Sequence, residues 1–367
     1  MDRRHTVPVV YYHSVGPVIQ GWYRNFLTLD PEAFRAHLEY FSRNFTVISL
    51  KELWLIRTGQ SETVRRPLVI TFDDGYSDNF TWVFPLLKRY GVKATIFVSP
   101  AFVDDREIPR TENDPPGFLS WQEMKLMLES GLVDIGSHTL THTKYFISDC
   151  IKDFHHPGGD ILYPAINEFP ERRTDNIGDK DFEKILPYGY PLFEDSSAVI
   201  ARKVSINRDF INECIYRLSG YDFGRYSFPT AYGLIEDLYN KYRSANRLIT
   251  KRESEEDYLK RLKEEIFESK SILEKNLGNK VEFLCWPHGD NNELAHSMAM
   301  EAGYLMTTIG KAQGISEDDT TRIPERVGVN FSSRARKLKT VSKLRALSGQ
   351  YPYRTVMKIL RKLRRGR

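Results

Sequence analysis

The sequence lacks the features of a membrane-spanning or disulfide-stabilised protein. No apolar run approaches the roughly 18 residues that a membrane span needs, and the longest candidate, 92–103, is interrupted by a lysine and a proline. Its three cysteines, Cys150, Cys214 and Cys285, are widely spaced and include no Cys-x-x-Cys pair, which disfavours both a disulfide framework and a thiolate zinc site. The first residues contain no recognisable secretory signal. These absences predict a cytoplasmic globular protein.

The composition predicts a folded chain with a sizeable core. Of the 367 residues, 41% are apolar and 13% are aromatic, which is too many for a disordered chain. The net charge of +4 is the sum of two unlike parts. Residues 334–367 hold 13 Lys or Arg and no Asp or Glu, which leaves 40 basic and 49 acidic side chains in residues 1–333.

The basic segment 334–367 predicts a helical C-terminal tail with an apolar stripe. Apolar residues recur there at helical spacing between the basic ones: Val356, Ile359, Leu360 and Leu363. Such a helix suits the anionic surface of a membrane, so we expect peripheral contact at the inner membrane face. A solvated basic terminus, or a helix packed on the acidic body, is an equally good interpretation. No nucleic-acid module accompanies the basic residues, so nucleic acid is not expected as a partner.

The rest of the chain alternates strand-like and helix-like segments, which predicts parallel strands joined by crossover helices. We expect strands at 9–12, 47–50, 68–72, 94–98, 133–137, 281–286 and 304–309, and helices at 31–45, 79–90, 121–130, 254–277 and 292–302. The alternation stops between about 143 and 252, where Pro, Gly and Tyr are frequent. We interpret this stretch as an insertion that covers or borders a site. Its tyrosines could offer stacking faces for sugar rings, or the insertion could be a structural cap.

Two pairs of residues that follow predicted strands could bind a metal ion. Asp73 and Asp74 end a buried apolar strand, where carboxylates need a metal, a cation or a catalytic role to compensate their burial; an ordinary Asp-Asp-Gly turn is the alternative. His138 and His142 follow the strand 133–137, and their spacing lets two imidazoles converge on one ion. One aspartate with two histidines leaves coordination positions for water and substrate, and the second aspartate could act as a base.

These motifs resemble the polysaccharide deacetylases with a NodB homology domain, carbohydrate esterase family 4. The resemblance rests on 71–76 (TFDDGY), 137–142 (SHTLTH) and 286–289 (WPHG), and it extends to 11–15 (YYHSV) and 94–98 (ATIFV). It implies a distorted (β/α)7 barrel over residues 1–333, with the insertion 143–252 and the tail 334–367 outside the resemblance.

The resemblance also implies roles for individual residues. Asp73 would be the general base, while Asp74, His138 and His142 would bind a divalent transition metal, most readily Zn²⁺, with Ni²⁺ or Co²⁺ as alternatives. The backbone amide of His288 would help to stabilise the oxyanion.

Two departures from the family pattern leave roles to be filled. Cys285 stands where many members have an arginine that steers the base, and Arg322 or Arg326 could replace that arginine. The family's C-terminal Leu-x-x-His motif, whose histidine supplies the general acid, is also absent from this sequence. The opening Tyr-His motif resembles a permuted subgroup in which the acid comes from the first strand, so we expect His13 to be the acid, with His288 as its rival.

The sequence thus predicts a metal-dependent hydrolase that removes acetyl from an N-acetylated amino sugar in surface polysaccharide or lipopolysaccharide biosynthesis. Its substrate would be nucleotide-linked, lipid-linked or an oligosaccharide. Hydrolysis of another non-peptide C–N bond or of an O-acetyl ester, and a catalytically silent sugar-binding protein, are the alternatives.

Overall fold

A parallel sheet that curls almost into a barrel forms the centre of the protein. The computed structural model describes residues 7–19, 25–173, 184–316, 319–353 and 355. Eight strands pair in the order β14-β13-β12-β7-β6-β5-β1-β15, and every neighbouring pair is parallel. In chain order they are β1 (Val9–Tyr12), β5 (Pro67–Phe72), β6 (Ala94–Val98), β7 (Val133–Ser137), β12 (Phe283–Leu284), β13 (Met306–Thr308), β14 (Arg322–Ile323) and β15 (Arg326–Gly328).

The two edges of this sheet are close together because only two residues join the edge strands β14 and β15. The expected distorted β/α barrel is therefore confirmed as a nearly closed parallel barrel. A short strand, β4 (Thr46–Val47), pairs with the start of β5, and β2 (Ser14–Val15) pairs with β3 (Thr28–Leu29) outside the barrel.

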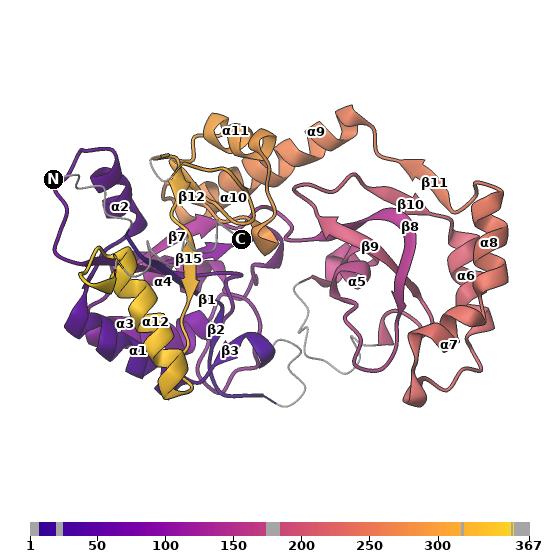
Figure 1. The fold of residues 1–367 in the computed structure, drawn as a ribbon, viewed down its shortest axis with the longest axis horizontal. Coiled ribbons are helices and arrows are strands. Elements are labelled where there is room, and N and C mark those ends of the chain that lie inside the picture. The colour runs from indigo at the N-terminus through magenta and orange to yellow at the C-terminus, as the bar shows by residue number, and fades with distance from the viewer. Residues whose placement is uncertain (1–6, 20–24, 174–183, 317–318, 354, 356–367) are drawn as a thin grey trace.

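Helices surround the barrel (Figure 1), and local sequence signals explain where they begin and end. They are α1 (Pro31–Asn44), α2 (Leu50–Arg57), α3 (Phe84–Tyr90), α4 (Trp121–Glu129), α9 (Glu255–Lys263), α10 (Ser269–Leu277) and α11 (Glu293–Glu301). Ser49 caps α2 in a capping box with Glu52. The expected strand 47–50 is wrong at its end for this reason, since Leu50 begins a helix. Gly278 ends α10 in the left-handed conformation that glycine adopts readily.

The insertion forms a second lobe beside the barrel (Figure 1). It consists of β8 (Lys144–Phe154), α5 (Leu162–Glu168), β9 (Pro191–Ser197), β10 (Val204–Ile206), α6 (Arg208–Arg217), α7 (Phe228–Gly233), α8 (Glu236–Ser244) and β11 (Ile249–Arg252). β8 pairs with β9 and β10 pairs with β11, both antiparallel. The lobe has its own apolar core, which includes Phe154, Phe210 and Leu238.

The first part of the basic C-terminal segment forms α12 (Arg334–Leu347). Leu344 belongs to the main core of the barrel, whereas residues 334–339 are exposed. The apolar residues expected to form the tail's stripe, Val356, Ile359, Leu360 and Leu363, lie outside the described residues. Within the described part of the chain, every helix is too short or too polar to cross a bilayer.

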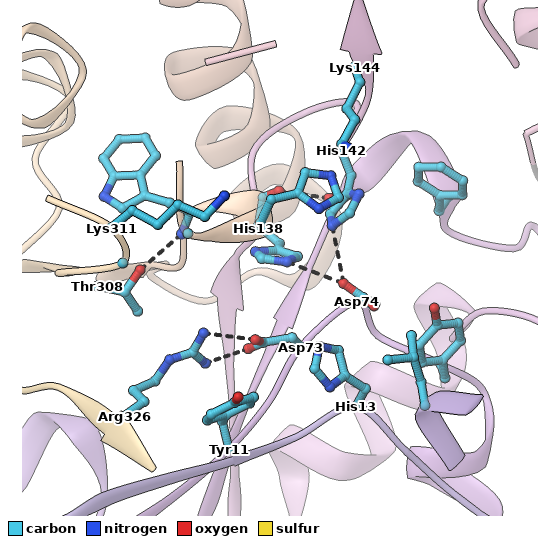
Figure 2. A pocket seen from close by; sticks show the side chains of 18 of the residues that line it. Tyr11, His13, Asp73, Asp74, His138, His142, Lys144, Thr308, Lys311 and Arg326 are labelled. Atoms are coloured by element: carbon cyan, nitrogen blue, oxygen red, sulfur yellow. Dashed lines mark hydrogen bonds and ion pairs between the residues drawn. The ribbon is translucent and has the colours of Figure 1, made fainter. Parts of the chain in front are cut away.

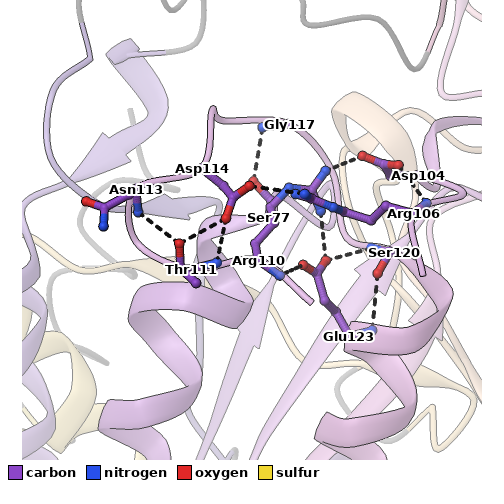
Figure 3. Close-up of polar contacts among 10 residues, drawn as sticks. All are labelled: Ser77, Asp104, Arg106, Arg110, Thr111, Asn113, Asp114, Gly117, Ser120 and Glu123. Atoms are coloured by element: carbon purple, nitrogen blue, oxygen red, sulfur yellow. Dashed lines mark hydrogen bonds and ion pairs between the residues drawn. The ribbon is translucent and has the colours of Figure 1, made fainter. Parts of the chain in front are cut away.

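A long loop between β6 and α4 is held by a buried arginine. Arg110 donates from Nη1 to Glu123 Oε2 at 2.9 Å and also pairs with Asp104 (Figure 3). The Arg110 backbone amide donates to Glu123 Oε1 at 2.8 Å. Since this loop carries Phe118, which lines the main cavity, the ion pairs fix one wall of that cavity.

We predict that Glu123→Gln lowers the free energy of unfolding by about 3 kcal/mol, because it leaves a buried guanidinium with an incomplete set of partners. Glu129→Gln on the same helix is exposed and should change stability by less than about 0.5 kcal/mol. Urea denaturation checks both variants, and equal midpoints would contradict the role given to Glu123.

Candidate active site

The functional side chains lie where the parallel strands end, at one edge of the barrel. Backbone hydrogen bonds continue the ladder one residue past the strands: Asp73 N donates to Tyr12 O, His138 N to Val98 O, and Cys285 N to Ser137 O, each at 2.9 Å. The carboxyl ends of parallel strands share one edge of a sheet. Residues that are far apart in the sequence therefore meet at this edge (Figure 2).

Asp74, His138 and His142 converge on one point. Each histidine Nε2 lies 3.2 Å from Asp74 Oδ1, and the three ligand atoms lie within 4.8 Å of one another. Both Asp74 and His142 adopt positive φ angles, 71° and 46°, which turn these side chains inward. The glycine after Asp74 has no room for a side chain, since a Cβ there would approach Val98 to 2.9 Å.

The surroundings of these three residues suit a metal ion. His138 Nδ1 lies 2.7 Å from the backbone carbonyl of Cys285, and a hydrogen bond donated by Nδ1 leaves the Nε2 lone pair for a ligand. Burial opposes ionisation of Asp74, but the two neighbouring imidazoles hold the pKa of its carboxyl well below the ordinary value. An ionised carboxylate and two imidazoles form a donor set that fits a divalent transition metal.

Asp73 is held by an arginine from the last strand of the barrel. Arg326 donates from Nη1 to Asp73 Oδ1 at 2.6 Å and from Nη2 to Oδ2 at 2.8 Å (Figure 2). Burial alone would raise the pKa of Asp73, and Arg326 holds that pKa below its ordinary value. Of the two arginines considered as substitutes, Arg326 therefore contacts Asp73, the candidate base, whereas Arg322 donates to Asn291 and Glu293.

Cys285 lies beside this ion pair and fills the position left by the missing family arginine. Its Sγ is 3.6 Å from Asp73 Oδ1 and 3.0 Å from Arg326 Nη2. The thiol is fully buried.

A cavity of about 660 Å³ opens above these residues, and both acid candidates, His13 and His288, line it. The His288 ring is 4.8 Å from that of His142, measured between centroids. Burial, with His142 and Lys144 nearby, lowers the pKa of His288 to about 2. A neutral imidazole is a poor proton donor, which argues against His288 as the acid.

The insertion also contributes to the cavity. Lys144, Asp160, Leu162 and Tyr163 line it, and the Tyr163 ring lies 5.4 Å from that of His288. Of the insertion tyrosines expected to offer stacking faces, Tyr163 reaches this cavity, while Tyr221, Tyr226 and Tyr232 pack against the lobe's own core. Lys144 and Lys311 also line the cavity; nothing in the sequence distinguished them from other surface lysines.

Comparison with known proteins agrees with this geometry. The family model for polysaccharide deacetylases matches residues 60–164. The Bacillus subtilis protein YxkH, named as a polysaccharide deacetylase, is 31% identical over 137 residues, which is 37% of this chain and 43% of that protein. The poly-beta-1,6-N-acetyl-D-glucosamine N-deacetylase of Escherichia coli K12 is 26% identical over 122 residues, 32% of this chain and 18% of that protein.

The fold is shared with a solved de-N-acetylase from Aggregatibacter actinomycetemcomitans. The two structures superpose with a TM-score of 0.55 at 18% identity, over 90% of this chain and 98% of the other. The resemblance to the polysaccharide deacetylases is thus confirmed over residues 60–164, and the fold is shared along most of the chain. The match spans less than half the length of the two curated relatives named above.

We predict that Asp74→Ala weakens Zn²⁺ binding by at least about tenfold, because it removes the one carboxylate of the donor set. Asp160→Ala removes another carboxylate from the same cavity and should leave Zn²⁺ affinity unchanged. Isothermal titration with zinc measures both. Unaltered affinity and stoichiometry in Asp74→Ala would show that these residues are not the ligands.

A second prediction concerns Arg326, which favours the ionised form of Asp73. Replacing Arg326 with Met removes that stabilisation, so the pKa of Asp73 rises and the acid limb of the pH–kcat/KM profile moves to higher pH. Arg326→Lys keeps the charge but not the two-point contact and should show a smaller shift. Profiles of hydrolysis between pH 4 and 9 check this, and an unmoved acid limb in Arg326→Met would refute it.

Proposed function

We propose that this protein is a metal-dependent N-deacetylase that hydrolyses the acetamide group of an N-acetylated amino sugar. The observation that carries the proposal is the pairing of an arginine-held carboxylate, Asp73, with the Asp74–His138–His142 cluster in one cavity. The deacetylase domain and the similarity to a poly-beta-1,6-N-acetyl-D-glucosamine N-deacetylase support this substrate class.

In this proposal Asp74, His138 and His142 hold the metal. The metal supplies Lewis acidity that polarises the acetyl carbonyl and makes water a better nucleophile at neutral pH. Two imidazoles and one carboxylate favour Zn²⁺, with Ni²⁺ and Co²⁺ as the alternatives.

The side chains then divide the proton transfers between them. Asp73 accepts a proton from water at a carboxylate oxygen while the water oxygen bonds to the acetyl carbon. Arg326 orients Asp73 and keeps it ionised before the reaction. The backbone amide of His288 donates to the oxyanion that forms. His13 donates a proton to the sugar nitrogen as the C–N bond breaks, which releases acetate and the free amino sugar.

The biological setting remains a prediction from the sequence. We propose a role in surface polysaccharide or lipopolysaccharide biosynthesis, on the cytoplasmic side of the membrane, with a nucleotide-linked, lipid-linked or oligosaccharide substrate. The exposed basic residues at the start of α12 are compatible with contact with anionic lipid. With His13 as the acid, the protein would resemble the permuted subgroup that starts with a Tyr-His motif and takes its general acid from the first strand.

The proposal is tested by measuring acetate released from N-acetylglucosamine oligomers by the zinc-loaded protein. Asp73→Asn should lower kcat by about 10²–10⁴-fold, because an amide cannot accept the proton. Asp209→Asn changes an exposed carboxylate on α6 and should leave kcat unchanged. Acetate release by Asp73→Asn at the wild-type rate would reject the mechanism, and no release from any N-acetylated sugar would reject the function.

A further inference from the structure

A second pocket lies in the insertion lobe and adjoins the active-site cavity. Its volume is about 440 Å³, within the size range of small-molecule sites. The two pockets share two lining residues, Lys144 and Tyr163. Because the Tyr163 ring is also 6.2 Å from the ring of His142, a ligand could extend from the metal cluster past Tyr163 into the second pocket.

The charges that line this pocket are unbalanced in favour of cations. Its basic residues outnumber its two carboxylates: they are Lys144, Arg173, Lys203 and Arg208. Both carboxylates are already engaged. Arg208 donates to Glu168 Oε1 and Oε2 at 3.1 and 2.6 Å, and Lys144 Nζ lies 3.3 Å from Asp195 Oδ1.

Lys203 and Arg173 are left without a carboxylate within ion-pair distance among the residues that the structure describes. The Arg173 Nε is buried and has no hydrogen-bond partner there. Burial and the nearby guanidinium of Arg261 lower the pKa of the Lys203 ammonium, and the carboxylate of Glu253 opposes this shift only in part.

Two of the four aromatic rings that line the pocket, those of Tyr145 and Tyr163, have cations over them, which leaves less ring surface for sugar stacking. Lys203 Nζ and the Arg261 guanidinium lie 4.6 and 5.0 Å from the centroid of the Tyr145 ring. Lys144 Nζ lies 5.5 Å from that of Tyr163. At these two rings a ligand therefore meets ammonium and guanidinium groups rather than an open ring face.

We propose that this second pocket binds an anionic group of the substrate, a phosphate or a carboxylate, while the neighbouring acetamide occupies the metal site. The inference rests on the proposed deacetylase function and adds to it a substrate class, an N-acetylated sugar that carries a negative charge. Lys203 and Arg173 are the proposed binding residues, since neither has a carboxylate within ion-pair distance in the described chain and their long side chains suit oxyanion recognition.

The direct test is isothermal titration of the zinc-loaded protein with inorganic pyrophosphate and, separately, with glucuronate. The variant to be compared with the wild type combines Lys203→Gln with Arg173→Gln. The metal site is unchanged in the wild type, the double variant and the control, so binding of an anion to the metal affects all three equally. Lys251→Gln is the matched control, because Lys251 lies opposite Ser205 on the paired strand and is exposed beside Asp257. We expect at least about tenfold weaker binding in the double variant and wild-type binding in the control.

Which anion binds shows whether the negative group of the substrate is a phosphate or a carboxylate. Binding of pyrophosphate alone indicates the phosphate of a carrier, and binding of glucuronate alone indicates a sugar carboxylate. Equal affinity of wild type and double variant for both anions, or no binding of either, overturns the proposal.

A kinetic measurement separates failure of this inference from failure of the proposed function. The double variant should raise KM about tenfold for a uridine-diphosphate-linked or uronate-containing N-acetylated sugar and leave KM for neutral N-acetylglucosamine oligomers unchanged. Equal effects on charged and neutral substrates would contradict the anion site. If no sugar is deacetylated but anion binding still depends on Lys203 and Arg173, the pocket assignment stands and the proposed function falls.

Discussion

The ion pair between Asp73 and Arg326 is the interaction on which the rest of the site depends. Two adjacent carboxylates at the end of a buried strand repel each other, and without compensation at least one would take up a proton. Arg326 offsets the charge of Asp73 through two short contacts, while the two histidines offset that of Asp74. Each carboxylate can then stay ionised and perform a different task.

The barrel makes this division possible by bringing strand ends together. Asp73 follows β5, the histidines follow β7, and Cys285 follows β12, so their positions are fixed by the same hydrogen-bonded ladder that holds the sheet. Cys285 serves this arrangement through its backbone carbonyl, which accepts from His138, and through its thiol, which contacts Arg326. The positive charge beside Asp73 is therefore supplied by Arg326 from β15.

The sequence predicted the parts of the fold and site that depend on local signals. The buried apolar run of β5, the Asp-Asp-Gly turn and the two histidines were identified from type and spacing, and the structure brings these residues together. The partner of Asp73 could only be narrowed to Arg322 or Arg326, because the pairing joins residues about 250 positions apart and depends on how the barrel closes. The contact between His138 and the Cys285 carbonyl involves a backbone atom, which every residue has, so the sequence does not indicate it.

The insertion was harder to predict for a related reason. Strand β8 has few buried residues along its length, so it shows little of the alternation that marks a half-buried strand. Its pairing with β9 spans some 40 residues of intervening chain, and the basic pocket arises only when α5, β8 and β10 pack together. The sequence indicated that this segment bordered a site, and in the structure Lys144, Asp160, Leu162 and Tyr163 line the active-site cavity.

We propose above that Asp74, His138 and His142 hold one metal ion beside Asp73, the carboxylate bound by Arg326. Anomalous X-ray diffraction from crystals grown with zinc tests it most directly. We expect one strong anomalous peak within bonding distance of Asp74 Oδ1 and both histidine Nε2 atoms, with the ion pair between Asp73 and Arg326 intact. A peak instead among Asp73, His138 and Cys285, the other group of possible ligands in the described residues, or no peak in this cavity, would contradict it.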